Sequence, residues 1–439
     1  MGRKKSDLLL FLLISPLSFL GNRALREDFK RIYIFSSYYI NNSCVFLIKV
    51  SEVRDLVQLT IPEALKGFLN EQEVPQIIGE LPPEISREVV NQVLLSAENA
   101  TKISSTIIRY RERIRKIMQR QKLLNQFHED SAIKLFNIAA VDGTYKVIST
   151  TMYDIIFVGT AAFSFRPDGF HYEVYTLLTP PSILSEKIAR GTMMLLEFKM
   201  ASELLKDYEF IILDGSYIAN LTNIGELIAA RVQHPDDPVW ESDELMEMLK
   251  RLAKRRIISK LLKIPKAIAA PKKQTGKLLM REYLDGLNIN ATDAAVLSLV
   301  LEQKEWIKIS WLGRQFLLAS KFYNSDITPI DADFVERYIN EVGLDIIYFK
   351  PREWTKAYKV AVPGRVGKNQ LQKILNLIYH QTDNPMIEEL EFQYLAHKIC
   401  SQLAKVALIL FTSTKNVLQQ KFARKWVNMI FTATRNRTS

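Results

Sequence analysis

The order of strand-forming and helix-forming segments leaves few folds open to this chain of 439 residues. Three strand patterns come first, and a turn at Arg166–Gly169 joins the second to the third; the strands are Asn137–Val141, Asp154–Phe165 and Tyr172–Leu178. A helix from about Ser185 to Asp207 follows, and short strands then alternate with helices; these strands are Phe210–Leu213, Ala267–Ala270, Ile346–Phe349, Tyr358–Val362 and Val406–Phe411. This order predicts an α/β fold with a mixed sheet flanked by helices.

A short motif occurs twice, in which an apolar strand is followed by Asp, Gly and a hydroxyl residue. It is Val141-Asp142-Gly143-Thr144 in the first strand and Leu213-Asp214-Gly215-Ser216 in the later one. One Asp-Gly after a strand is usually a turn, and that reading remains open for each. Two such pairs favour both carboxylates at strand ends over one cleft, where their mutual repulsion favours a bound divalent cation.

Glu197 is unusual because its neighbours in the predicted helix are apolar. The residues three and four positions away, on the same helix face, are Met193, Met194, Met200 and Ala201. A carboxylate buried in such a stripe needs a partner. We prefer a metal ion as that partner, with an ion pair to a buried Arg or Lys as the alternative.

Two further residues are candidates with simple structural alternatives. His397 lies in a helical pattern whose same face is mostly apolar, which also fits a core histidine hydrogen-bonded to the backbone. Asp293 follows Thr292 at the start of a predicted helix, where helix capping accounts for it.

Positive charge is concentrated in parts of the chain. There are 59 Lys and Arg against 48 Asp and Glu, giving a net charge of +11. The stretch Lys250–Lys273 holds ten Lys or Arg and no acid, and the stretch after Glu391 also lacks acids. Such clusters favour contact with a phosphate backbone, although a solvated helix face is the alternative for each residue alone. The candidate DNA contacts are Lys254, Arg255, Arg256, Lys272 and Lys273.

Several chemistries are excluded by missing motifs. The sequence has no P-loop, nucleophile-elbow, zincin or dinucleotide fingerprint, so we expect no nucleotide cofactor. Its two cysteines cannot build a four-thiolate zinc site. A metal would therefore be held by carboxylate and imidazole groups.

Residues 1–50 are predicted to be an apolar appendage. A basic start precedes an apolar run from Leu8 to Leu20 that resembles a signal peptide, but Ser15 and Pro16 interrupt this run and no clean cleavage site follows. We expect a cytoplasmic protein, with export or membrane tethering through residues 1–22 as the alternative.

Together the motifs resemble the NurA nuclease family over roughly residues 135–412. The segments that carry the resemblance are Ala140–Thr144, Glu197, Leu213–Ser216, Tyr358–Pro363, Asn384-Pro385 and Ala396-His397. Members of that family have an RNase H-like core related to the Piwi domain and process DNA ends. They work as dimers with a HerA-type hexameric ATPase. Thr144 in place of the commoner Ser, and Asp383-Asn384 in place of Gly-Tyr, are departures from the family pattern.

The resemblance implies roles for particular residues. Asp142, Glu197, Asp214 and His397 would be catalytic and would bind Mn²⁺ or Mg²⁺, as two ions. Lys272 or Lys273 would match a basic residue that follows a strand, and Asp293 an acidic residue that opens the next helix.

The resulting expectation is a metal-dependent DNA nuclease that acts as a 5′–3′ exonuclease and single-strand endonuclease in DNA end processing. Its partners would be DNA ends, a HerA-type ATPase and a second copy of the chain, and repair and antiviral roles both remain open. The alternative is a degenerate RNase H-like module that binds nucleic acid or the ATPase without cleavage. We expect three regions: the appendage, a helical lead-in at 51–130 with a basic helix at Ser104–Gln126, and a NurA-like domain at 131–439 with a basic helical insertion at about 239–266.

Overall fold

A computed structural model of the chain describes residues 83–129, 137–150, 152–166, 169–272, 276–318, 325–421 and 433–435. The predicted appendage at 1–50 and Lys273 lie outside these residues. The chain divides into two units at Glu98 and Asn99. The described part of the first unit is the beginning of helix α6 (Pro83–Arg120), and the sheet belongs to the second unit.

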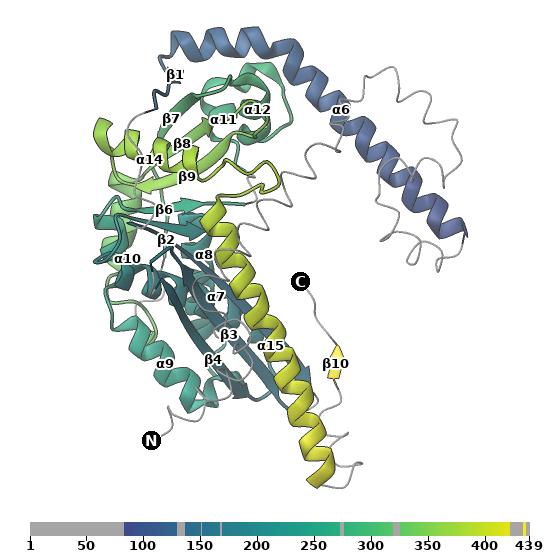
Figure 1. The fold of residues 1–439 in the computed structure, drawn as a ribbon. Helices are drawn as coiled ribbons and strands as arrows, with labels where there is room; N and C mark the ends of the chain where they lie inside the picture. The colour runs from purple at the N-terminus through teal and green to yellow at the C-terminus, as the bar shows by residue number, and fades with distance from the viewer. Residues whose placement is uncertain are drawn as a thin grey trace. The chain divides into compact units, whose positions relative to one another are not determined.

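One mixed sheet organises the second unit (Figure 1). Its strands follow the order β1-β7-β8-β9-β6-β5-β2-β3-β4, with β10 pairing beside β2. The strands are β1 (Asn125–Gln126), β2 (Ile138–Thr150), β3 (Asp154–Phe163), β4 (Phe170–Thr179), β5 (Phe210–Asp214), β6 (Ala267–Ala270), β7 (Glu305–Trp311), β8 (Leu344–Lys350), β9 (Tyr358–Pro363) and β10 (Ala433–Arg435).

The core of the sheet has the arrangement predicted as RNase H-like. Strands β2, β3 and β4 form an antiparallel meander, and β5 and β6 then add in parallel on the other side of β2. Strands β7, β8 and β9 extend the sheet in antiparallel order beyond β6. The prediction of an α/β fold with a mixed sheet flanked by helices is confirmed.

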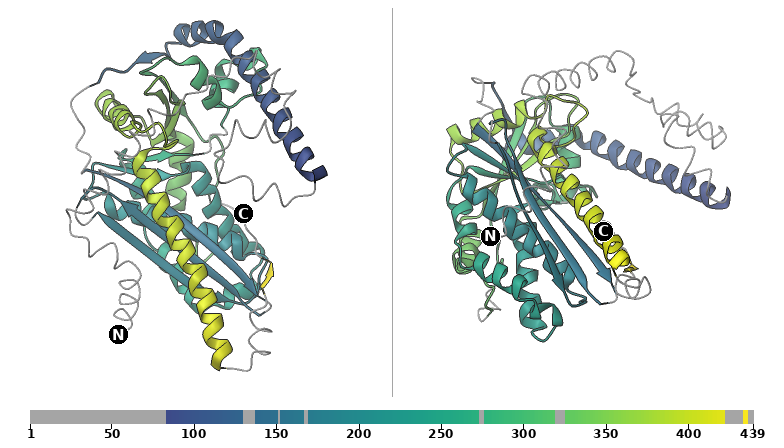
Figure 2. Two further views of the ribbon diagram at one scale, coloured as in Figure 1. Left: turned by 45° about the vertical axis from the view of Figure 1, so that its right-hand side comes forward. Right: turned by 60° about the horizontal axis from the view of Figure 1, so that its bottom comes forward.

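Two helical layers cover the sheet, because alternate residues of each strand point to opposite faces. Ala139 and Val141 of β2 pack into one core cluster with helices α7 (Ser185–Leu204) and α8 (Tyr217–Gln233). Ile138 and Ala140 point the other way and pack with α14 (Lys368–His380) and α15 (Glu391–Lys421). Helix α15 runs along β2 and β3 in both views of Figure 2.

The remaining helices are short and lie between the strands in sequence. They are η2 (Pro238–Glu241), α9 (Asp243–Ala253), α10 (Ile257–Lys263), α11 (Leu278–Tyr283), η3 (Asp285–Leu287), α12 (Asp293–Val300), α13 (Ala332–Arg337) and the π-helical turn η4 (Tyr338–Val342). No helix in the described ranges is both long enough and apolar enough to span a bilayer.

The structure corrects three details of the sequence interpretation. Strand β2 does not end before Asp142 but continues to Thr150, because the residues after Asp142 keep pairing with β3. The predicted strand Val406–Phe411 is helical and lies within α15, since no Gly or Pro interrupts the helix after Glu391. The basic helix predicted at Ser104–Gln126 ends at Arg120, as part of the longer α6.

Candidate metal and nuclease site

The candidate site lies where strand β5 ends beside β2. Pairing between these parallel strands runs only from Ile138 to Val141, opposite Phe210 to Leu213. Asp142 and Asp214 come next on the two strands and share the face that α15 covers. Beyond this point β2 lacks β5 as a neighbour, so side chains from both helical layers can reach the two carboxylates.

Each of the two motif glycines orients the Asp before it. The backbone N–H of Gly143 donates to Asp142 Oδ1 at 2.8 Å, and that of Gly215 donates to Asp214 Oδ1 at 2.9 Å. Gly215 has a φ of +81°, a left-handed conformation that favours glycine and lets the chain turn from β5 into α8. The repeated Asp-Gly pattern thus presents one carboxylate from each strand, as the sequence predicted.

Lys272, which follows β6, lies among three carboxylates. Its Nζ atom is 2.9 Å from Asp214 Oδ2, 3.5 Å from Asp142 Oδ2 and 3.4 Å from Glu389 Oε2. Asp142 is almost completely buried, and Lys272 is partly exposed. A single ammonium group therefore compensates much of the negative charge in the site.

Glu197 enters the site from α7, on the opposite face of the sheet from α15. Its side chain is only 2% exposed, as its apolar neighbours predicted. Within the described residues it forms no ion pair, and its Oε2 atom is buried without a hydrogen-bond partner. The alternative of an ion pair with a buried Arg or Lys is therefore not found in this part of the chain.

One face of α15 contributes three side chains to the same place. His397 Nδ1 lies 2.9 Å from Asp142 Oδ2, and the Cys400 thiol donates to the carbonyl oxygen of Asp142 at 3.0 Å. The buried Gln393 amide donates both to Asp214 Oδ1 and to the carbonyl oxygen of Ala270. The His397 side chain is 46% exposed, so it is not the core histidine considered as its alternative.

Crowding of charge shifts the pKa values of these groups in opposite directions. Burial, followed by the charges of Asp142 and Asp214, raises the pKa of Glu197 well above its usual value. Burial and the Asp142 charge raise the pKa of Asp214 to about 6. Burial also acts to raise the pKa of Asp142, but the hydrogen bond to His397 and the Lys272 charge outweigh it, so this pKa is lowered. The hydrogen bond to Asp142 in turn raises the pKa of His397.

The residues fit a hard divalent cation. No three His, Cys, Asp or Glu side chains in the described ranges are arranged as a ready-made metal site, and the Lys272 ammonium lies among the carboxylates instead. Carboxylates are nevertheless the preferred ligands of Mg²⁺ and Mn²⁺, and the unpaired buried oxygen of Glu197 is one that a cation would satisfy.

Other residues singled out in the sequence lie elsewhere. Asp293 is buried, and its carboxylate accepts hydrogen bonds from the N–H groups of Leu279 and Met280 and from the Tyr348 hydroxyl. It therefore caps helix α11 rather than its own helix, where Thr292 is the N-cap.

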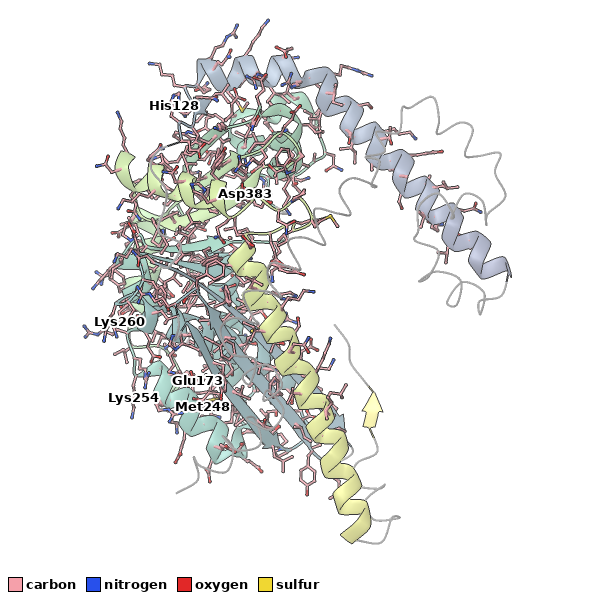
Figure 3. All side chains as sticks on the ribbon, viewed as in Figure 1. His128, Glu173, Met248, Lys254, Lys260 and Asp383 are labelled. Carbon is pink, nitrogen blue, oxygen red and sulfur yellow. The ribbon has the colours of Figure 1, made fainter. Side chains whose placement is uncertain are left out.

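The predicted DNA contacts are divided between two places. Lys272 lies in the site, whereas Lys254, Arg255 and Arg256 are exposed between α9 and α10, which pack in the α7 layer. Figure 3 shows Lys254 and Lys260 on that side, away from α15. Arg255 is paired with Glu203 at 3.0 Å.

Sequence reasoning missed Gln393 and Glu389. The available signal was spacing, because Gln393, His397 and Cys400 are related by i, i+4 and i+7 and must share one face of a helix. Glu389 lies four residues before Gln393, just ahead of the helix.

Comparison with known proteins identifies a family. The sequence model of the NurA domain matches residues 136–407, which include every site residue named above. No curated protein matches the sequence closely enough to count as a relative.

Solved NurA structures also match this chain and are distant from it in sequence. The NurA nuclease from Sulfolobus solfataricus is 15% identical, with a TM-score of 0.51 over 78% of this chain and 99% of its own. A NurA structure with manganese is 18% identical, with a TM-score of 0.46 over 72% of this chain and 96% of its own. A NurA structure bound to dAMP and manganese is 17% identical, with a TM-score of 0.43 over 72% and 93%.

Proposed function

Because the chain belongs to the NurA family, we propose that it is a divalent-metal-dependent deoxyribonuclease that hydrolyses phosphodiester bonds at DNA ends. The observation that carries this proposal is that Asp142, Asp214, Glu197 and His397 lie in one site. The two aspartates come from strands β2 and β5, Glu197 from the helical layer on one face of the sheet, and His397 from the layer on the other face. These four residues would hold Mn²⁺ or Mg²⁺, as two ions. When bound, such ions activate water and stabilise the leaving oxygen of a phosphodiester.

The residues of the chain itself prepare the site for an anionic substrate. His397 holds the Asp142 carboxylate through Nδ1, and Gln393 holds that of Asp214. Both contacts keep the carboxylates oriented before substrate arrives, which reduces the reorganisation needed during reaction. Lys272 brings the positive charge needed beside a scissile phosphate, and its pKa is raised because the attraction of Asp142 and Asp214 exceeds the effect of burial.

The finer features of the proposal follow from the family resemblance. They are 5′–3′ exonuclease and single-strand endonuclease activity, a HerA-type ATPase as partner and a homodimer. Lys254, Arg255 and Arg256 would hold the DNA backbone without reading its sequence. We also retain the cytoplasmic location expected from the sequence.

The decisive experiment incubates purified protein with end-labelled linear DNA and with circular DNA, in Mn²⁺ or EDTA. We expect loss of linear DNA only when Mn²⁺ is present. Asp142→Asn and Asp214→Asn should reduce the rate by more than about a thousandfold, because several kcal/mol of charge stabilisation are lost, while DNA binding persists. Asp285→Asn is the matched control, since this exposed Asp also precedes a Gly.

The second candidate is a non-cleaving module that binds nucleic acid or the partner ATPase. The position of Lys272 favours it, because an ammonium lies where the carboxylates would bind a cation. This candidate predicts DNA binding without cleavage, even with a HerA-type ATPase, and no rise in melting temperature on adding Mn²⁺. DNA that stays intact under all these conditions would establish it and reject the nuclease.

A further inference from the structure

A fourth carboxylate reaches the site from the segment that joins α14 to α15. Glu389 Oε2 lies 3.4 Å from Lys272 Nζ, the same nitrogen that contacts Asp142 and Asp214. The Glu389 side chain is only 14% exposed. Three carboxylates from β2, β5 and this segment therefore share one ammonium group.

The oxygen of Glu389 that faces Lys272 is poorly satisfied. In the described part of the chain, Oε2 is buried and accepts no hydrogen bond, so the ion pair at 3.4 Å is its only polar contact. A buried carboxylate oxygen normally has at least one hydrogen-bond partner, and leaving it without one is unfavourable. Glu197 Oε2, at the other side of the site, is in the same condition.

The position of Glu389 is fixed by its surroundings. Leu390 is buried beside it, and the next two backbone N–H groups donate to Gln381: that of Glu391 to the carbonyl oxygen at 3.0 Å and that of Phe392 to the side-chain oxygen at 2.8 Å. Glu388 lines the same small cavity as Glu389, but its side chain is exposed and forms no ion pair within the described residues. Of the two adjacent glutamates, the segment thus places only Glu389 in an ion pair with Lys272.

We infer that Glu389 is a further cation-binding carboxylate of this site, in addition to Asp142, Glu197, Asp214 and His397. The inference rests on the proposed function. Its rival is a purely structural role, in which Glu389 only neutralises Lys272. The two roles differ in whether Glu389 still matters once Lys272 has lost its charge.

The test measures Mn²⁺ affinity by isothermal titration calorimetry, without DNA, in a double-mutant cycle. We expect Glu389→Gln to weaken Mn²⁺ binding about tenfold or more, both in the wild-type background and in Lys272→Met. The matched control, Glu388→Gln, should bind Mn²⁺ like the wild type. Melting temperatures in EDTA establish that each variant is folded.

The following results would overturn the inference. If Glu389→Gln binds Mn²⁺ normally, or loses its effect in the Lys272→Met background, Glu389 acts only through Lys272. If Glu389→Gln does not fold, Glu389→Asp replaces it, and affinity equal to that of Glu388→Asp rejects the inference. A wild-type protein that binds no Mn²⁺ rejects the proposed function as well, so the two failures are distinguishable.

Discussion

The Glu197 carboxylate lies directly against Gly143: a Cβ atom at Gly143 would come within 2.4 Å of Glu197 Oε1. It would also lie 2.6 Å from Met193 Cγ, one turn earlier on α7. The glycine of the first Asp-Gly motif is therefore required by close packing between β2 and α7. This contact joins the Asp142-Gly143 motif to Glu197, which the sequence singled out because its helix neighbours are apolar.

We expect Gly143→Ala to lower the free energy of unfolding by about 1 to 3 kcal/mol, the usual effect of overpacking a core. Because Glu197 must move aside, Mn²⁺-dependent cleavage should fall more than stability alone explains. Urea unfolding and a cleavage assay measure the two effects. Gly286→Ala is the control, since nothing lies within 4 Å of a Cβ atom at Gly286. Unchanged stability and activity in Gly143→Ala would contradict the packing described here.

The Gln393→Leu variant tests whether Gln393 positions the Asp214 carboxylate for cleavage, in addition to stabilising the fold. The substitution removes the donor to Asp214 and leaves the buried carbonyl oxygen of Ala270 unpaired, so we expect a stability loss of about 1 to 3 kcal/mol. Cleavage should fall about 10- to 100-fold, as for other residues that orient metal ligands. The control is Gln370→Leu, which removes a comparable bond to the Pro265 carbonyl oxygen away from the site. Equal activity in both variants would exclude a positioning role for Gln393.

Asp293→Asn should affect stability and leave metal binding unchanged. The substitution weakens three hydrogen bonds that join α11 and β8 to the start of α12, so the free energy of unfolding should fall by about 2 kcal/mol. Calorimetric titration should give the wild-type affinity for Mn²⁺, in contrast to Asp214→Asn. Weakened Mn²⁺ binding in Asp293→Asn would show that this residue contributes to the metal site.

The ion pair between Arg115 and Glu305 predicts a pH-dependent part of the stability. Arg115 Nη1 lies 2.7 Å from Glu305 Oε2 and Nη2 lies 2.8 Å from Oε1. Burial acts to raise the pKa of Glu305, but the hydrogen bonds from Arg115 prevail and lower it below its ordinary value of 4.5. A carboxyl group whose pKa is lower in the folded state than in the unfolded state stabilises the folded protein at pH values above its unfolded pKa. This stabilisation is lost as the pH falls through the folded-state pKa.

Glu305→Gln should therefore be less stable than the wild type by about 2 kcal/mol at pH 7, and this difference should shrink progressively below pH 4.5. Urea unfolding at a series of pH values measures the difference. Glu302→Gln serves as the control, because an exposed ion pair contributes about 1 kcal/mol or less. A stability difference between the wild type and Glu305→Gln that stays constant down to acid pH would show that the charge of Glu305 does not stabilise the fold.

The double variant Lys254→Glu with Arg256→Glu tests the exposed basic surface between α9 and α10. We expect weaker binding to DNA of any sequence, with a salt dependence lower by about one for each lost phosphate contact. Arg255 is left in place because it is paired with Glu203. Lys187→Glu, outside the basic stretches, is the control. The control changes the net charge by half as much as the double variant, so a control that loses half as much binding free energy would mean that net charge, rather than this surface, determines binding.

The sequence predicted what depends on local patterns. The strands β3, β5, β6 and β9 follow from alternating or continuous apolar residues, and the burial of Glu197 followed from its helix neighbours. The extent of β2 could not be predicted, because pairing with β3 rather than its own composition carries it past Asp142. A short apolar run such as Val406–Phe411 fits either a strand or a helix. It is helical here because it lies inside the long, uninterrupted helix α15.

Beyond the pairing of Asp142 with Asp214, the side-chain contacts between distant segments could not be predicted from the sequence. The contacts of Lys272 with Asp142 and Glu389 depend on how β6 and the start of α15 are placed in space. The same is true of Asp293, whose capping of α11 requires the fold of residues 276–293 around it. Local propensity could mark each residue as unusual but could not identify its partner.

The placement of α15 has a consequence for the newly made protein. Apart from β10, the described strands of the sheet all end by Pro363, so a nascent chain contains them before α15 has been synthesised. Such a chain, or one shortened before Glu391, would carry Asp142 and Asp214 together with Lys272 but would lack Gln393 and His397. The proposed activity would thus require α15 to be synthesised and packed on the sheet, because a product shortened before Glu391 lacks the groups that hold Asp142 and Asp214.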